Sequence, residues 1–338
     1  MNLSFLGSKP ATKPALETLD VNIETLGREH AGKSGGKKMM FRIVQQGPLP
    51  SGLDLSPKDP RTLVKLMNES IAQYRNLQKT GFISTTDPEL IEYRLFEGDK
   101  LKAVLKLRES LGQLLTFTDD GSDKRMQEQF DKHHDNLAAA DVIHVYVSCP
   151  ANDHPSSLER LQNDLAILRQ NLCEVLNLRK AGRKSAVALV VSKPDGPYAT
   201  LEDAKLALND ETLRRMLHRL VLLLEGSEKV GLGAIFVMSS FGYGKARLLE
   251  PSVTNGSHAP QKGFSLLSDG EPEWILKENE LPMPHNLTGL VWWTIMAGLA
   301  LKPVGAKGDE MARTAQMLLD DLKAMDAWFV PLNCRVTR

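Results

Sequence analysis

Short apolar runs alternate with longer helical patterns through the middle of the chain. Residues 142–148, 186–192 and 234–239 are compact runs of the kind found in the buried strands of parallel sheets. The segments 156–179 and 201–224 repeat apolar residues at helical spacing. This alternation predicts an α/β fold, a mostly parallel sheet with helices on both of its faces.

The N-terminal part of the chain adds strands in which apolar and polar residues alternate. Residues 21–26 predict the first strand, and residues 113–118 predict another. Residues 92–96 and 101–107 alternate well enough to pair as strands, with Gly98 at the turn between them.

The pattern also predicts how the chain is organised. Residues 1–15 are polar with two prolines, which indicates a flexible N-terminus. We expect residues 16–250 to form the main domain, with a helical insertion near residues 55–80. Residues 251–338 are expected to form a loop and a C-terminal helical extension packed on the same domain. The two helices predicted in this extension are 287–301 and 310–325.

Two clusters of residues in predicted helices or at their ends have a structural interpretation. Trp292 and Trp293 lie in a helix that is apolar on all sides, which favours packing on the sheet. The basic residues of segment 179–184 predict a helix C-terminus that is capped by cations and faces water.

Composition and charge exclude several classes of protein. The 338 residues include 42 basic and 42 acidic side chains, so no general attraction to nucleic acid or to an anionic membrane is expected. Three cysteines at unrelated spacings predict neither a disulfide framework nor a zinc site. The longest apolar stretch, residues 289–301, is too short to span a membrane, and the N-terminus lacks the apolar core of a signal peptide. We therefore expect a cytoplasmic protein.

The first strand leads directly into the pattern G-x-x-x-x-G-K-S. Its glycines allow backbone N–H groups to surround phosphates, the lysine reaches the β- and γ-phosphates, and the serine hydroxyl binds Mg²⁺. A helix predicted over residues 33–46 would turn the positive end of its dipole toward the anion. The residues of this predicted phosphate-binding loop are Gly27, Arg28, Glu29, His30, Ala31, Gly32, Lys33 and Ser34. The alternative is a flexible surface turn rich in glycine and lysine.

A second motif follows the strand at 186–192. Ser192-Lys193-Pro194-Asp195 resembles the N/T-K-x-D base-recognition motif of P-loop GTPases. A carboxylate can accept hydrogen bonds from both N1–H and N2–H₂ of guanine, whereas adenine offers no such pair of donors. The alternative is an ordinary polar turn after a strand.

The order of these motifs between Val21 and Gly244 resembles the TRAFAC class of P-loop GTPases, its translation-factor and Ras-like branch, and bacterial GTPase-like domains within it. The resemblance implies a Ras-like fold and the binding of GTP or GDP. It implies that Asp195 selects guanine and that the stem of Lys193 packs over the base. Ser239 and Ser240 occupy the place of the family's S-A-K loop, whose backbone N–H groups meet guanine O6.

The resemblance also implies residues that sense the γ-phosphate. Thr85 or Thr86 lies where the first switch is expected and would bind Mg²⁺; which of the two does so stays open. Gly121 ends a sequence that corresponds to the family's D-x-x-G motif and would donate its N–H to the γ-phosphate. The family's aspartate is replaced by Thr118, and the adjacent Asp119 is the candidate ligand for metal-bound water.

The implied reaction is slow hydrolysis of GTP to GDP and phosphate, assigned to Lys33, Thr85 or Thr86, and Gly121, with Mg²⁺ as cofactor. It is expected to be slow because no glutamine follows Gly121 in register and Glu29 would repel the γ-phosphate. The chain would act as a nucleotide-dependent switch toward a protein partner or a second GTPase subunit. An ATP-using P-loop enzyme and a catalytically weak scaffold remain the alternatives.

Overall fold

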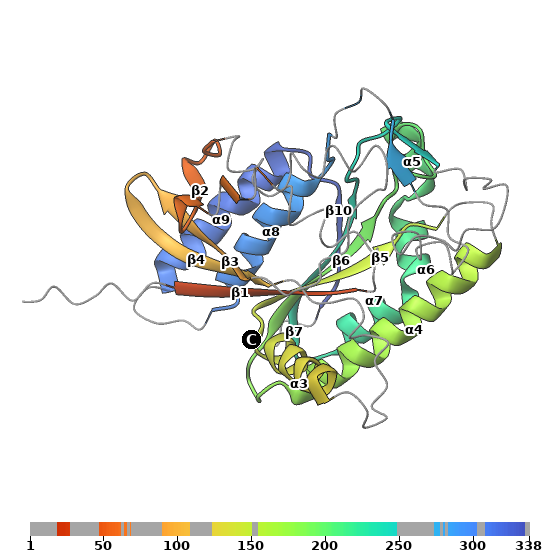
Figure 1. Ribbon diagram of the computed structural model, residues 1–338. Helices are drawn as coiled ribbons and strands as arrows, with labels where there is room; N and C mark the ends of the chain where they lie inside the picture. The colour runs from red at the N-terminus through yellow and green to blue at the C-terminus, as the bar shows by residue number, and fades with distance from the viewer. Residues whose placement is uncertain are drawn as a thin grey trace, which may run out of the picture.

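The computed structural model describes residues 19–27, 47–61, 64–65, 68, 90–108, 124–150, 155–248, 274–277, 280, 283–302 and 308–334. These residues form a sheet that is covered by helices on both faces (Figure 1). The predicted strand at 113–118, the predicted helix at 33–46, residues 1–15 and most of the interval 55–80 lie outside the described residues.

The main sheet has eight strands in the order β10-β7-β6-β5-β1-β4-β3-β2. The five strands from β7 to β4 are mutually parallel, while β10, β3 and β2 run antiparallel to their neighbours at the two sides. The strands are β1 (Leu19–Leu26), β2 (Leu53–Pro57), β3 (Leu90–Glu97), β4 (Lys100–Arg108), β5 (Val142–Ser148), β6 (Ser185–Ser192), β7 (Val230–Met238) and β10 (Phe329–Pro331). A separate antiparallel pair joins β8 (Ala246–Leu248) to β9 (Trp274–Leu276).

The helices divide between the two faces of the sheet (Figure 1). One face is covered by α8 (Leu287–Ala300) and α9 (Gly308–Ala324). The other face is covered by α3 (Lys124–Ala139), α4 (Pro155–Leu178), α5 (Leu201–Ala207), α6 (Asp210–Met216) and α7 (His218–Gly226). The predicted α/β fold, with a mostly parallel sheet between two layers of helices, is confirmed.

Alternation along the central strands builds a separate core on each face. In β5, Val142 and Tyr146 belong to the core under α8 and α9, while Ile143 and Val145 belong to the core under α4 and α7. Both faces of a parallel sheet are buried in this way, which explains the continuous apolar runs in the sequence. Trp292 and Trp293 of α8, 1% and 4% exposed, lie in the first core, as predicted.

Several predicted elements differ from the observed ones in detail. The segment 201–224 forms three short helices because Thr200 and Asn209 act as N-caps, accepting hydrogen bonds from the backbone N–H groups of Asp203 (3.1 Å) and Thr212 (3.0 Å). Helical residues begin at Pro60, directly after β2. The three- to five-residue strands β2, β8, β9 and β10 were not predicted, since such short runs carry no clear periodicity.

The carboxyl ends of the parallel strands meet along one edge of the sheet, which we call the carboxyl edge; the edge at their amino ends is the amino edge. Ser192 at the end of β6 is in register with Ser148 of β5 and with Met238 of β7. From β1 the chain builds β4, β3 and β2 on one side and then β5 to β7 on the other. Gly27, which follows β1, therefore lies where the strand order reverses, which is where open α/β sheets bind ligands.

No helix in the described ranges is both long enough and apolar enough to cross a membrane.

Candidate functional site

The carboxyl edge of the sheet gathers the part of the predicted site that the structure describes. Gly27 follows β1 directly, Ser192 ends β6, and Ser239 follows β7. The residues of the predicted site that lie outside the described residues are Arg28, Glu29, His30, Ala31, Gly32, Lys33, Ser34, Thr85, Thr86, Asp119 and Gly121. The described part of the site therefore consists of Gly27 after β1 and of the loops after β6 and β7.

Asp195 joins the loop after β6 to the loop after β7. Its Oδ2 accepts hydrogen bonds from the Ser239 hydroxyl (2.7 Å), the Phe241 amide (2.8 Å) and the Gly242 amide (3.0 Å). The structure thus brings together two segments that lie more than forty positions apart in the sequence. These donors fix the direction in which the carboxylate points.

The second oxygen of this carboxylate has unused bonding capacity. Asp195 is only 3% exposed, yet Oδ1 has no hydrogen-bond partner within the described part of the chain. Burial raises the pKa of Asp195, while hydrogen bonds from Ser239, Phe241, its own backbone N–H and Gly242 favour the ionised form. A buried acceptor left unpaired costs about 1–3 kcal/mol, so Oδ1 is placed to accept from a ligand or water.

The loop after β7 can reach Asp195 because residue 242 is a glycine. Gly242 has φ +97°, and a Cβ built on it would lie 2.7 Å from the Met283 carbonyl oxygen. Its N–H also lies 2.8 Å from the Ser239 hydroxyl oxygen, which accepts from it and donates to Asp195. The Ser239 hydroxyl therefore uses both its donor and an acceptor position to hold this loop against Asp195.

The predicted lysine and serine of the first loop have different surroundings. The Ser192 hydroxyl is buried and donates to the Val147 carbonyl (3.2 Å), which ties β6 to β5. Lys193 has φ +61°, a left-handed conformation uncommon for residues other than glycine, and is half-buried. The chain therefore turns sharply between the end of β6 and Asp195.

The segment before α8 supports the loop after β7, and sequence reasoning missed it. Met283 donates its N–H to Phe241 O (2.7 Å), and Ser239 and His285 exchange two backbone hydrogen bonds (3.1 and 3.3 Å). The Asn286 side chain donates to the carbonyls of Val237 (2.9 Å) and of Trp328 (2.6 Å), the residue directly before β10. No local pattern in the sequence signals these contacts.

Four buried polar atoms near this edge, Asp195 Oδ1 included, have no hydrogen-bond partner in the ranges the structure describes. They are Asp195 Oδ1, Ser240 Oγ, the Tyr243 hydroxyl and His285 Nδ1. The rings of Tyr243 and His285 meet edge to face with centroids 5.8 Å apart. Because buried polar groups are normally satisfied, such a concentration indicates a place where a polar ligand or ordered water completes the bonding.

The same edge carries a thiol that is unsuited to nucleophilic attack. Cys149 follows β5, is 8% exposed, and donates its backbone N–H to Ser192 O (2.8 Å). Burial, with the charge of Asp195, raises the pKa of Cys149 to about 12. The thiol therefore stays protonated at neutral pH.

Across the described residues, no group of three or more His, Cys, Asp or Glu side chains is arranged to hold a metal ion. The predicted Mg²⁺ ligands Ser34, Thr86 and Asp119 lie outside those residues.

No protein-family model matches the chain, and no curated protein sequence matches it. Among solved structures, the chain resembles the S. cerevisiae Ski7 GTPase-like domain bound to GDP and inorganic phosphate, with 13% identity and a TM-score of 0.38. The match covers 66% of this chain and 43% of that one, so this chain spans less than half of that structure's length. At this TM-score the likeness is too weak to assign a ligand or an activity.

Proposed function

We propose that this chain binds a guanine nucleotide at the carboxyl edge of its sheet and hydrolyses GTP slowly. The observation that carries the proposal is the Asp195 carboxylate, whose Oδ2 is held by three donors while Oδ1 is buried without a described partner. When the carboxylate is ionised, this oxygen complements the N1–H and N2–H₂ donors of guanine. The G-x-x-x-x-G-K-S sequence leaves the same edge at Gly27.

The remaining roles rest on the sequence motifs. In the proposal the backbone of residues 27–34 surrounds the phosphates, and Lys33 neutralises the β- and γ-phosphates. Mg²⁺ would be held by Ser34 and by Thr85 or Thr86, with Asp119 reached through water, and would offset phosphate charge. Gly121 would donate to the γ-phosphate, and the Ser240 backbone would meet guanine O6.

The wider setting is also part of the proposal. We place the chain in the TRAFAC class of GTPases, with a Ras-like fold, acting in the cytoplasm. Loops ordered by the γ-phosphate would relax after hydrolysis and alter a surface read by a protein partner or a second GTPase subunit. Because turnover by the chain alone is expected to be slow, a partner that supplies an arginine would accelerate hydrolysis.

A binding experiment with Asp195→Asn tests the guanine assignment. An asparagine whose oxygen keeps the three donors of Oδ2 must turn its NH₂ group toward the base. This NH₂ group would repel the N–H donors of guanine but could donate to xanthine, which carries a carbonyl at position 2. Displacement of a fluorescent nucleotide should show at least a tenfold loss for GDP and a gain for xanthosine diphosphate.

The same assay separates the alternatives. ATP displacing the probe better than GTP would end the guanine assignment. The parent and Lys33→Ala should differ strongly in phosphate release from GTP with Mg²⁺. Equal phosphate release from both proteins would contradict the proposed hydrolysis and favour the alternative of a catalytically weak scaffold.

A further inference from the structure

Tyr243 places a hydroxyl group among the unpaired polar atoms at the carboxyl edge. It follows the loop whose Ser239 and Gly242 hold Asp195. Its ring packs against the core under α4 and α7 and meets the ring of His285 edge to face. The ring is therefore fixed, while its hydroxyl is buried without a described partner.

Tyr243 directly follows Gly242, whose N–H lies 3.0 Å from Asp195 Oδ2. Burial, followed by the charges of Asp195 and Cys149, raises the pKa of Tyr243 above its ordinary value. The phenol therefore remains protonated at neutral pH and can donate a hydrogen bond. A donor beside a carboxylate acceptor makes a mixed polar surface that a ligand with both kinds of group would satisfy.

Guanine has such a pattern on one edge, because the acceptor O6 adjoins the donor N1–H, which is followed by the N2 amine. We propose that Tyr243 is a base-contacting residue whose hydroxyl donates to guanine O6 while Asp195 Oδ1 accepts from N1–H and N2–H. This inference rests on the proposed guanine-nucleotide function and adds a side chain that lies outside both base-recognition motifs. The rival explanation is an ordered water that joins the unpaired atoms and leaves the base untouched.

The test compares the parent with Tyr243→Phe, which removes one oxygen and keeps the ring against His285. The ligands are GDP and 6-thioguanosine diphosphate, in which sulfur, a weak acceptor, replaces O6 and both N–H donors remain. We expect Tyr243→Phe to weaken GDP binding about tenfold and 6-thio-GDP binding less than about threefold. Tyr93→Phe, at a buried tyrosine of β3, is the matched control and should change neither affinity.

Each other outcome has a distinct meaning. Equal GDP affinity of the parent and Tyr243→Phe would overturn the role of Tyr243 while leaving the guanine site in place. Equal losses for GDP and 6-thio-GDP would also overturn it, because the residue would then act by packing alone. Failure of the parent to bind either nucleotide would remove the proposed function itself, and with it this inference.

Discussion

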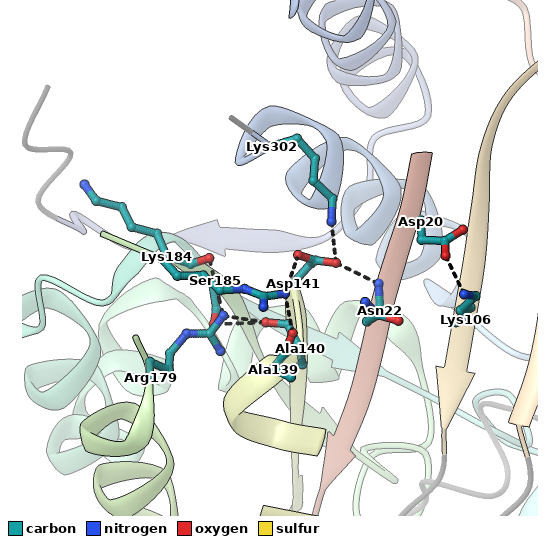
Figure 2. A network of polar contacts seen from close by, with 11 residues as sticks. Asp20, Asn22, Lys106, Ala139, Ala140, Asp141, Arg179, Lys184, Ser185 and Lys302 are labelled. Atoms are coloured by element: carbon teal, nitrogen blue, oxygen red, sulfur yellow. Dashed lines mark hydrogen bonds and ion pairs between the residues drawn. The ribbon is translucent and has the colours of Figure 1, made fainter. Parts of the chain in front are cut away.

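Two buried aspartates at opposite edges of the sheet have opposite hydrogen-bonding patterns. Asp195, at the carboxyl edge, has one oxygen with three donors and one with no described partner. Asp141, at the amino edge, is engaged through both oxygens (Figure 2). Burial is similar, at 3% and 7% exposed, so the difference lies in the partners.

Asp141 connects four parts of the molecule. Its Oδ2 accepts from the backbone N–H of Asn22 in β1 (2.9 Å) and from the Lys302 ammonium beyond α8 (2.6 Å). Its Oδ1 faces the guanidinium of Arg183 (3.4 Å), which lies before β6. Figure 2 shows Asn22 and Lys302 converging on Asp141, the residue directly before β5. Nearby, Arg179 donates to the carbonyl of Ala140 (2.5 Å), just after α3.

The comparison separates a structural aspartate from a candidate functional one. The donors around Asp141 satisfy it within the protein and cross-link strands and helices. The donors around Asp195 orient it and leave an acceptor for something else. Protein interiors rarely leave a buried oxygen unpaired without a functional reason, which makes Asp195 the candidate for ligand recognition.

The largest expected effect comes from replacing each aspartate by asparagine and measuring urea-induced unfolding. Asp141→Asn should lower the free energy of unfolding by about 3–5 kcal/mol, because it removes the buried anion that pairs with Lys302 and Arg183. Asp195→Asn should change it by less than about 1 kcal/mol, since an amide oxygen still accepts the three donors. Similar losses of unfolding free energy for the two variants would contradict the distinction between a structural Asp141 and a candidate functional Asp195.

A third buried carboxylate, Glu24, extends the comparison because its burial should make the stability of the protein depend on pH. Glu24 of β1 is 2% exposed, and its Oε1 lies 3.3 Å from Arg108 Nη1. Burial raises the pKa of Glu24 from 4.5 to about 7, against the opposing charge of Arg108. The folded state then holds the proton more tightly than the unfolded state, so the contribution of Glu24 to stability is present below pH 4.5 and is lost as pH rises to about 7.

We therefore expect the unfolding free energy of the parent to fall by about 3 kcal/mol over that range on account of Glu24. Glu24→Gln should lack this part of the pH dependence, as measured by urea unfolding at a series of pH values. A parent that gains stability over the same range relative to Glu24→Gln would show that the pairing with Arg108 outweighs burial.

The smallest effect is expected at an ion cluster nearer the surface. Glu310 of α9 accepts from Lys100 (2.7 Å) and Lys102 (2.8 Å) of β4, and these hydrogen bonds lower the pKa of Glu310 to about 2. Its contribution to stability is present above pH 4.5 and is lost as pH falls toward 2. Because its side chain is 37% exposed, solvent screens the charges.

Glu310→Gln should therefore lower the free energy of unfolding by about 1 kcal/mol or less, and by still less in about 1 M salt. Asp320→Asn, at an exposed pair with Lys323 on the same helix, is the control and should have no measurable effect. A loss at Glu310 as large as that at Asp141 would mean that exposure does not distinguish these ion pairs.

The sequence by itself determined the layered architecture. The apolar runs of β5, β6 and β7 can be buried only between two layers of helices, and Gly98, at φ +58°, supplies the turn of the β3–β4 hairpin. The sequence also placed Asp195 and Ser239 after adjacent strands. Parallel strands bring their carboxyl ends to one edge, so their proximity follows from the fold class.

The tertiary structure decided which polar groups are satisfied. Arg179 was expected at a hydrated helix end, yet it is 3% exposed and donates to a carbonyl just after a different helix, α3. Asn22 and Asp141 meet across 119 positions, and His285 meets the loop after β7 from more than forty positions away. Such contacts depend on how helices pack and where loops cross, which local periodicity does not encode. The Asp195 oxygen that has no partner among the described residues, and the hydroxyl of Tyr243, could therefore be recognised only from the folded chain.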